Sequence, residues 1–443
     1  MKEVCRRSGG SRTMLRGLCL CGGFLLSVAV AATGQASKPS SPGTKTAVRQ
    51  KRPARTKPAT SIDWSYDLVE KSQTSVQALN LFGVQLTAKL ARQHPQKNIF
   101  ISPLSVFAAL AMTESGAAGQ TRDDMRKAMS VLSDVSEERL HESTAALLKT
   151  LPRNSGTKLL IANALWSDTR TPVSPAFSER SRELYQAEVR SLDLSRPEAA
   201  SAINTWVNQK TGGKIPAIVT PNQTRNAGAI ITNAVYFQGG WSEKFDKRET
   251  RSATFHLPEH REKTVFMMHQ PSISDAYRSG AGFEAAALSY ERSGMVLYVI
   301  LPDPGIAPEA ALANVNVSRL GQRSERNELD LRLPRFTIDF SASLEDSLTG
   351  MGMGTAFHPG ADFTGFSHAG FFIGDVWHVT RLEVDEEGTV AAAATSLGVL
   401  GGVSPPQVIH KRVLVVDRPF ALLLCDRSTT AIIFSGVVYD PAP

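Results

Sequence analysis

The residues that could perform catalytic chemistry do not stand in the spacings of three common catalytic and phosphate-binding motifs. A nucleophile elbow needs G-x-S-x-G, but two residues separate Ser367 from the following glycine. A zinc-protease helix needs H-E-x-x-H, and only His141 followed by Glu142 begins that way. The Gly-Gly-Lys run ending at Lys214 lacks the earlier glycine of a phosphate loop, because Asn208 occupies that position. We therefore predict no enzyme activity, no metal site and no cofactor.

The most unusual segment of the chain spans residues 385–406. Two glutamates and a Gly-Thr pair precede four consecutive alanines, and a Gly-rich stretch ending in Pro-Pro follows. The alanines alone would suggest a fragment of helix or a low-complexity loop. Neither interpretation explains the acidic pair and the Gly-Thr that stand immediately before them. This segment is therefore neither a simple helix fragment nor a simple low-complexity loop.

The charge of the chain is concentrated at its beginning. The net charge is +7, but residues 1–62 hold twelve Lys and Arg against one Glu, which leaves residues 63–443 at −4. The main part of the chain is therefore mildly acidic, which argues against nucleic-acid binding. We also see no cluster of Lys and Arg on an expected helix, so no heparin site is supported.

The N-terminal 62 residues read as two segments outside the main domain. Residues 1–36 combine a basic start, an apolar stretch over 18–32 and small residues at its end, which predicts a secretory signal. An uncleaved signal anchor is the alternative. Residues 37–62 are rich in Pro, Ser, Lys and Arg and predict a disordered basic linker. The domain itself is expected over residues 63–443.

Export has consequences for cysteines and glycans. Three of the four cysteines lie within residues 1–36, so Cys425 alone remains and no intramolecular disulfide can form after cleavage. Its apolar neighbours predict a buried structural thiol. Asn222 and Asn316 begin N-x-S/T sequons and are possible glycosylation sites.

The elements that must position the 385–406 segment divide into helices first and strands later. Apolar spacing predicts a helix over residues 69–92, a second helix capped at Ser102, and others around 121–150, 175–187 and 198–210. Ser102 followed by Pro103 is typical of a helix start. Strands are expected at 159–165, 229–237, 295–301, 329–338, 413–416, 420–424 and 431–438. This order predicts an α+β protein rather than a repeating βαβ array.

The 385–406 segment resembles the hinge of the serpin family, whose reactive loop opens with E-E-G-T-x-A-A-A-A-T. The matching residues are Glu386, Glu387, Gly388, Thr389, Ala391, Ala392, Ala393, Ala394 and Thr395. Other stretches similar to the family follow in the right order, at 98–106, 203–207, 233–237, 301–303, 333–336, 361–365, 418–420 and 434–436. Each is weak alone, but their shared order makes coincidence untenable.

The resemblance implies the serpin fold: a helical upper half, a large central mixed sheet, two smaller sheets and an exposed reactive-centre loop. It also implies that the protein is a suicide substrate for a serine protease. Cleavage lets the loop insert into the central sheet as a new strand while the protease is still held as a covalent acyl-enzyme. In the family, a small hydrogen-bonded cluster controls opening of that sheet, and it is matched here by Ser102, Ser105, Asn233 and His378.

Length and composition of the loop agree with insertion. The segment 388–402 would span roughly 50 Å as a strand, close to the diameter of about 54 Å expected for a domain of this size. Thr389, Ala391, Ala393 and Thr395 would face the core, and none of them is charged or large. Val379 and Val390 depart from residues common in the family, Lys and Glu, without contradicting the mechanism.

The position of the reactive bond is less sharply determined. Family spacing places it at Gly402–Val403, with Leu400–Gly401 as the alternative. No Lys or Arg lies within 398–406, so we expect a target of elastase-, chymotrypsin- or subtilisin-like specificity. We expect a secreted monomer. The alternative functions are a non-inhibitory serpin that acts as carrier, storage protein or chaperone, and an inhibitor of papain-like cysteine proteases.

Overall fold

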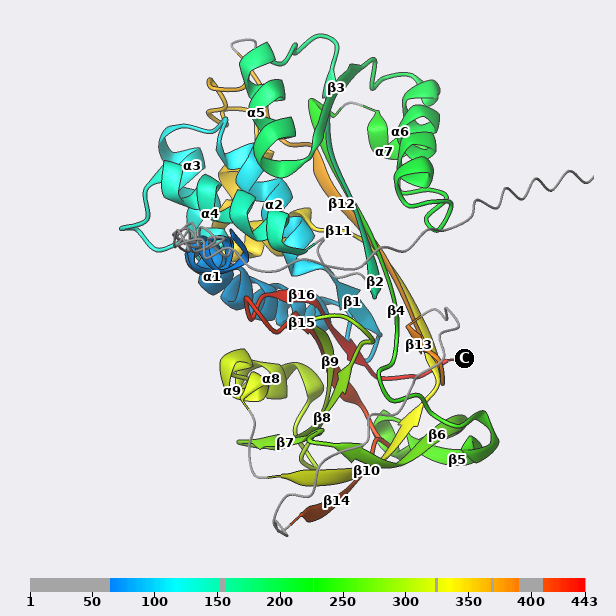
Figure 1. Ribbon diagram of the computed structural model, residues 1–443. Coiled ribbons are helices and arrows are strands. Elements are labelled where there is room, and N and C mark those ends of the chain that lie inside the picture. The colour runs from blue at the N-terminus through cyan, green and yellow to red at the C-terminus, as the bar shows by residue number, and fades with distance from the viewer. Residues whose placement is uncertain are drawn as a thin grey trace, which may run out of the picture. The chain divides into compact units, whose positions relative to one another are not determined.

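The computed structural model describes residues 64–151, 156–225, 227–322, 326–367, 370–389 and 409–442. The helices of these ranges are α1 (Trp64–Gln93), α2 (Pro103–Glu114), α3 (Gly119–Ala128), α4 (Glu137–Thr150), α5 (Pro175–Tyr185), α6 (Pro197–Lys210), α7 (Pro221–Thr224), α8 (Pro308–Ala313), α9 (Val317–Gly321) and α10 (Glu345–Leu348). Figure 1 shows α3, α5 and α6 toward the end of the molecule opposite β10 and β14, and the long α1 nearer the middle.

The strands form three sheets. The central sheet has the order β11-β12-β13-β4-β2-β3, a second has the order β1-β16-β15-β9-β8-β7, and the third has the order β14-β10-β6-β5. Their bounds are β1 (Ile99–Ile101), β2 (Thr157–Asp168), β3 (Glu188–Leu192), β4 (Ala229–Gly240), β5 (Arg251–His256), β6 (Glu262–Ser274), β7 (Tyr277–Gly280), β8 (Phe283–Ser289), β9 (Met295–Pro302), β10 (Asn327–Pro334), β11 (Phe336–Ser343), β12 (Asp375–Val384), β13 (Gly388–Thr389), β14 (His410–Val415), β15 (Phe420–Asp426) and β16 (Ile432–Val438).

Helices cover both faces of the central sheet. Successive residues of a strand point to opposite faces, so Ile230 and Ala234 of β4 pack in a small core with α6, while Ile231 and Val235 join the larger core with α2 and α4. Figure 1 shows α6 and α7 on one side of the sheet and α2 on the other. The sheet is therefore buried on both faces, which explains the nearly unbroken apolar run of β4.

The structure corrects two expectations about the elements. The helix expected around 121–150 is two helices, because Ser130 adopts a left-handed φ of 58° and Ser136 caps a new helix by accepting the N–H of Arg139. The strand expected at 329–338 is also two strands. β10 ends at Pro334, which has no N–H to donate, and β11 begins at Phe336 in a different sheet.

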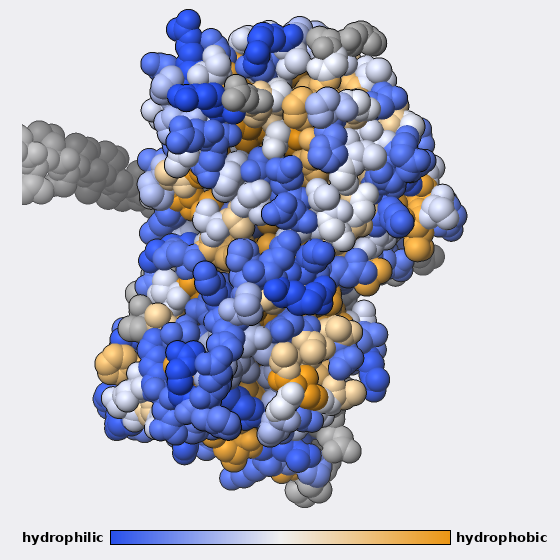
Figure 2. Space-filling model, turned by 180° about the vertical axis from the view of Figure 1, so that it is seen from behind, coloured by the Kyte–Doolittle hydropathy of each residue, from blue (hydrophilic) through white to orange (hydrophobic). Residues whose placement is uncertain are grey.

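The membrane-spanning potential of the helices, the environment of Cys425 and the character of the surface can be described. Within these ranges, no helix is both long and apolar enough to cross a bilayer. Cys425 is a free, buried cysteine, and burial raises the pKa of its thiol far above the ordinary value. The face shown in Figure 2 is largely hydrophilic, with separate hydrophobic areas. Residues 1–36 and 37–62, the expected signal and linker, lie outside the described ranges.

Candidate functional site: the buried cluster and the hinge of the central sheet

Three neighbouring strands of the central sheet place polar side chains in one row. His378 of β12 is the register partner of Asn233 of β4, and Asn233 is in turn the partner of Asn163 of β2. The first turn of α2 lies against this row, where the Ser102 hydroxyl caps the helix by accepting the N–H of Ser105 at 3.3 Å. The structure thus brings together Ser102, Ser105, Asn233 and His378, and adds Asn163.

Hydrogen bonds join these five residues, which we call the gate cluster. The Ser102 N–H donates to Nε2 of His378 (3.0 Å), so the ring proton resides on Nδ1, which donates to Oδ1 of Asn233. The amide of Asn233 donates to the Ser105 hydroxyl (2.6 Å) and to Oδ1 of Asn163 (2.5 Å), and the Ser105 hydroxyl donates to that same oxygen (2.8 Å).

The gate cluster holds its histidine neutral. His378 is wholly buried, and desolvation lowers its pKa to about 3. Protonation would also place a second N–H against the N–H of Ser102, since Nε2 is the acceptor of that bond. The imidazole therefore acts as a fixed acceptor and donor that fits only the present arrangement of strands.

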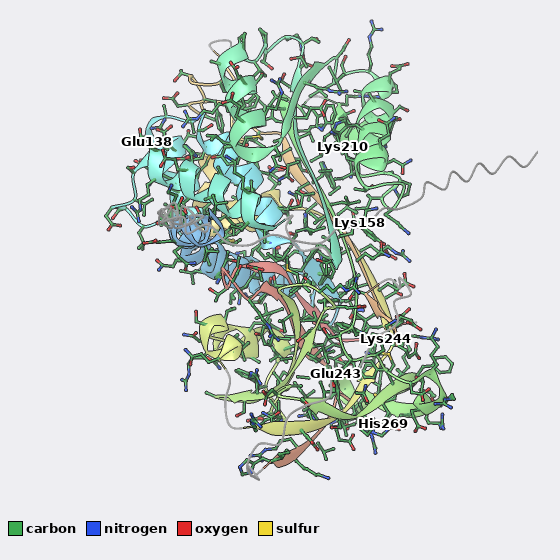
Figure 3. All side chains as sticks on the ribbon, viewed as in Figure 1. Glu138, Lys158, Lys210, Glu243, Lys244 and His269 are labelled. Carbon is green, nitrogen blue, oxygen red and sulfur yellow. The ribbon has the colours of Figure 1, made fainter. Side chains whose placement is uncertain are left out.

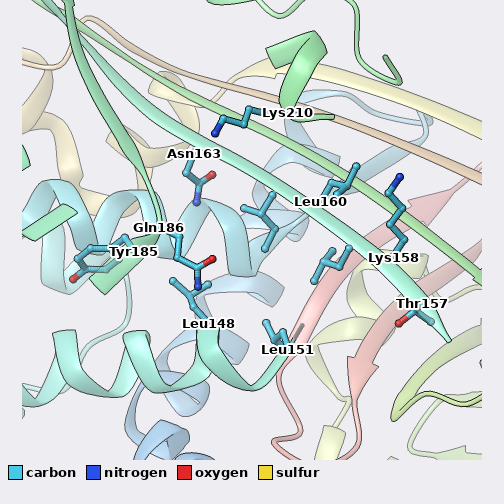
Figure 4. Close-up of a pocket in the computed structure, with 11 residues that line it drawn as sticks. Leu148, Leu151, Thr157, Lys158, Leu160, Asn163, Tyr185, Gln186 and Lys210 are labelled. Atoms are coloured by element: carbon cyan, nitrogen blue, oxygen red, sulfur yellow. The ribbon is translucent and has the colours of Figure 1, made fainter. Parts of the chain in front are cut away.

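The gate cluster spans the two strands that a new strand would have to separate. β12 and β4 are parallel partners from Asp375–Ile230 to Arg381–Tyr236, and the His378–Asn233 bond crosses between them. Inserting another strand there needs a widening of about 4.8 Å, which breaks this bond. Asn163 also borders a hollow of about 360 Å³ between β2 and the ends of α4 and α5 (Figure 4).

At the far end of the central sheet, the same two strands are already parted by a third. Gly388 and Thr389 form the short strand β13, in which Thr389 is the partner of both Val384 in β12 and Gly239 in β4. Thr389 is fully buried and shares a hydrogen bond of 2.6 Å with the hydroxyl of Tyr290. The first residues of the hinge segment therefore already lie between β12 and β4 in the intact chain.

Only glycine fits at the first position of β13. A Cβ added to Gly388 would lie 2.2 Å from the carbonyl oxygen of Gly239 and 2.7 Å from Cα of Gly240. Both contacts are with backbone atoms of β4, which cannot move aside without loss of the strand pairing. Any larger residue at this position would push β13 out of the sheet.

The turn that leads from β12 into β13 is held by hydrogen bonds to its backbone N–H and C=O groups. One carboxylate oxygen of Asp385 accepts the N–H groups of Glu387 (2.9 Å) and Gly388 (3.0 Å). The indole of Trp241 donates to the carbonyl of Asp385 (2.9 Å), and its backbone N–H donates to the carbonyl of Glu387 (3.0 Å). Trp241 itself is buried in a stacked contact with Tyr290.

The two hinge glutamates occupy different environments. Glu387 pairs with Lys244 (2.9 Å) and Lys247 (3.1 Å), and the hydrogen bonds from these lysines lower its pKa. Glu386 is buried and accepts a hydrogen bond of 2.7 Å from the hydroxyl of Thr250. Figure 3 labels Lys244 at the end of the central sheet near β13.

Sequence reasoning missed the partners of the hinge. Trp241, Lys244, Thr250 and Tyr290 lie about 100 to 145 residues before it, and no local pattern connects them to it. Asn163 left a clearer signal, because an amide within the apolar run 159–165 needs a buried partner.

The structure leaves several predicted site residues without a description. Ala391 to Thr395 and both candidate reactive bonds, Leu400–Gly401 and Gly402–Val403, lie outside the described residues. Both sequon asparagines are exposed: Asn222 lies in α7, and Asn316 caps α9 by accepting the N–H of Arg319 at 3.0 Å. Among the described residues, no group of three or more His, Cys, Asp or Glu is arranged to hold a metal ion.

Comparisons with known proteins agree with this architecture. Residues 77–441 match the family model described as serpin (serine protease inhibitor). The chain is 32% identical over 375 residues to the leukocyte elastase inhibitor of Bos taurus, covering 81% of this chain and 97% of that protein. It is also 32% identical over 385 residues to an uncharacterized serpin-like protein of Thermococcus kodakarensis, covering 85% and 88%.

Solved structures show the same fold. Human thyroxine-binding globulin in complex with its hormone matches with a TM-score of 0.74 and 26% identity, over 85% of this chain and all of that chain. Tengpin, a thermophilic serpin in its native state, matches with a TM-score of 0.72 and 27% identity, over 84% and 94%. The chain therefore belongs to the serpin family and has the α+β serpin fold.

Proposed function

We propose that the protein is a trapping inhibitor of serine proteases. The serine hydroxyl of the protease attacks the carbonyl carbon of the reactive bond, and the amine of the following residue leaves with a proton. An ester then joins the protease to the loop. If the loop inserts between β12 and β4 before water hydrolyses that ester, the protease is carried along and its active site is distorted.

The observation that carries this proposal is the position of Thr389. It is small, uncharged, fully buried and already paired with both β12 and β4. The same two strands are paired directly with each other from Asp375 to Arg381, so further insertion has a defined path. The gate cluster lies on that path and would break as the new strand advances.

The same site suggests how premature insertion is limited. The His378–Asn233 bond joins β12 to β4, and all five residues of the gate cluster are buried. Buried hydrogen bonds of this kind are expensive to leave unmade. We infer that the gate cluster keeps the sheet closed until cleavage frees the loop.

The finer parts of the proposal rest on the sequence. We propose Gly402–Val403 as the reactive bond, with Leu400–Gly401 as the alternative, and an elastase-, chymotrypsin- or subtilisin-like protease as the covalent partner. We propose secretion through residues 1–36, with an uncleaved signal anchor as the alternative. The similarity to leukocyte elastase inhibitor supports a protease with a preference for small apolar residues.

A second candidate function is supported by one comparison. Thyroxine-binding globulin, crystallised with its hormone, shares the fold at 26% identity, so a serpin of this shape can act as a carrier. The intact small-residue hinge favours the inhibitor, because a carrier has no need for an insertable strand. Inhibition of papain-like cysteine proteases through the same loop is a further alternative.

The proposal is tested by incubating the full chain with elastase, chymotrypsin, subtilisin, trypsin and papain. Denaturing electrophoresis is expected to show a stable complex with at least one serine protease other than trypsin. The mass of the released C-terminal peptide then identifies the reactive bond. Clean cleavage within 390–408 by every protease, without any complex, would favour the carrier function. A complex with papain alone would favour the cysteine-protease inhibitor.

A further inference from the structure

Exposed apolar side chains gather on one of the three sheets. Five large hydrophobic side chains are strongly exposed among the described residues, and three of them, Phe266, Ile409 and Val413, belong to the β14-β10-β6-β5 sheet or directly precede it. The other two, Leu81 and Leu132, lie in α1 and between α3 and α4. Figure 1 shows the four-stranded sheet at the end of the molecule opposite α5.

Residues 409–413, which comprise Ile409 and the first four residues of β14, are all exposed. Among the described strands, β14 pairs with β10 alone, in parallel, and so lies at the edge of this sheet. Ile409, Lys411 and Val413 are two residues apart and so lie on the same face, and Ile409 and Val413 are 50% and 63% exposed. Exposed Arg326 adjoins them, because its carbonyl accepts the N–H of His410 at 3.1 Å. We call Ile409, Lys411, Val413 and Arg326 the β14 contact face.

Covalent geometry places this face close to any protease that acts at the proposed reactive bond. Six residues lead from Val403 to Ile409, and a chain advances at most about 3.6 Å per residue, so the two lie within about 22 Å of each other. A protease of chymotrypsin size, about 240 residues, has a radius of about 23 Å. Since the chain runs C-terminally from the bond to β14, it leaves the cleft on the primed side, and this is the side of the protease that lies within reach of the face.

We propose that the β14 contact face is a secondary docking surface for the target protease. It fits a protease that carries an apolar patch and acidic side chains beside the primed side of its cleft. Apolar contacts with interspersed Arg or Lys are typical of protein interfaces, and opposite charges raise the association rate. This inference rests on the proposed function and adds a determinant of protease choice outside the loop.

The neighbours of the face favour a protein over a polyanion as its occupant. Glu328 is the register partner of Lys411, and Asp330 is the partner of Val413. These two carboxylates offset the charges of Lys411 and Arg326, so a sulfated or phosphorylated chain laid along the sheet would meet no net positive charge, whereas a protein can place single acidic side chains at Lys411 and Arg326. The exposed Ile409 and Val413 would also gain nothing from such a ligand, whereas both can be buried by a protein.

The test compares a triple variant with a matched control in the full chain. Ile409→Thr, Lys411→Gln and Val413→Thr remove the apolar surface and the charge while keeping residues that suit a strand. Leu132→Thr with Lys127→Gln is the control, since Leu132 is 62% exposed, Lys127 is exposed, and both lie in or next to α3. Second-order rates of complex formation are measured with elastase, chymotrypsin and subtilisin at low and high salt.

We expect the triple variant to form the complex about tenfold more slowly with at least one protease, and with a weaker salt dependence. Its stoichiometry of inhibition should match that of the parent, because partitioning after acylation depends on insertion and not on docking. A catalytically inactive Ser→Ala form of the affected protease should bind the variant about tenfold more weakly. The control should behave as the parent in each measurement.

The outcomes separate the docking surface from the proposed function. If the parent chain forms complexes and the triple variant forms them equally fast with all three proteases, the docking surface is refuted and the inhibitor function stands. If the variant is slower only when heparin is present, the face binds a polyanion and the inference is overturned. If the parent chain forms no complex with any protease, the proposed function fails and the inference fails with it.

Discussion

Replacing Thr389 with Arg is the sharpest perturbation of the proposed mechanism. The Thr389 side chain is fully buried between β12 and β4. Among the described residues, it shares a side-chain hydrogen bond with the hydroxyl of Tyr290 alone. No carboxylate is among the side chains that contact Thr389 through hydrogen bonds, so a guanidinium in that position would lack a partner of opposite charge. Burial of an unpaired charge costs at least about 3 kcal/mol, so the hinge is expected to leave the sheet.

The kinetic consequence follows from the same magnitude. If the full penalty of about 3 kcal/mol is present in the transition state for insertion, insertion slows by roughly a hundredfold. Hydrolysis of the acyl-enzyme then wins, and the inhibitor becomes a substrate. The rest of the fold should be unaffected, since β13 consists of only two residues at one end of the central sheet.

The assay is a titration of a fixed amount of protease with the variant, followed by electrophoresis. We expect many molecules of the Thr389→Arg variant to be cleaved for each protease trapped, with the cleaved chain as the main product. Thr389→Ser, which keeps the hydroxyl near Tyr290, serves as the control and should inhibit with a stoichiometry close to that of the parent. An arginine variant that inhibits with the parental rate and stoichiometry would refute insertion through this hinge.

Three further predictions concern single buried or paired groups. The pKa of His378 is about 3 in the folded chain and about 6.5 in the unfolded chain. Between these pH values only the unfolded state binds the extra proton. The contribution of His378 to the free energy of unfolding is therefore complete above pH 6.5 and falls by up to about 1.4 kcal/mol per pH unit below it. In the His378→Gln variant, the melting temperature should decline less steeply with falling pH. The decline that remains comes in part from His141, whose pKa is also lowered to about 3. An unchanged slope would contradict this prediction. Glu387→Gln should lower the melting temperature by less than about 3 °C, since its partly exposed pairs contribute at most about 1 kcal/mol; a loss above 10 °C would show that the hinge pairs hold the fold. Cys425 should react with a thiol reagent only after denaturation, because the thiol is buried; rapid labelling of Cys425 in the native protein, located by the mass of the labelled peptide, would contradict its position.

The hinge illustrates what could be predicted from the sequence and what could not. The resemblance of the segment from Glu386 to Thr395 to the serpin hinge implied an insertable strand, and the alternation of side chains along such a strand predicted that Thr389 would face inward. That the strand is already begun in the intact chain could not be predicted. It depends on contacts with Trp241 and Tyr290, whose approach is fixed by strand pairing and not by local sequence.

The gate cluster shows a similar division. Ser102 was recognisable as a helix cap, but its contact with His378 was expected only from the family resemblance. Asn163 joins the cluster because the register of β2, β4 and β12 aligns one polar residue from each strand. A shift of one residue in either pairing would turn these side chains to the opposite face, so the cluster depends on tertiary register.

A proline and a residue in the left-handed conformation explain the errors in the element boundaries. Residues 329–338 were predicted as one strand, yet the chain changes sheets between Pro334 and Phe336. The apolar residues also change phase there, from Leu329, Leu331 and Leu333 to Phe336 and Ile338. Proline ends hydrogen bonding on one side, but the sequence does not say that the next residues join another sheet. In the 121–150 region, Ser130 adopts the left-handed conformation and separates α3 from α4.

Thermal unfolding of the chain before and after cleavage within 390–408 tests loop insertion most directly. Catalytic amounts of a protease that cleaves the loop without being trapped provide the cleaved form. A fully inserted strand over 388–402 adds about 13 residues to the two already paired in β13, and about 13 new backbone hydrogen bonds are together worth roughly 10 kcal/mol. For a domain of about 380 residues, this corresponds to an increase of about 12 °C in melting temperature. A rise of that size is the result we predict. A melting temperature equal to or below that of the intact chain would contradict insertion and the trapping mechanism built on it.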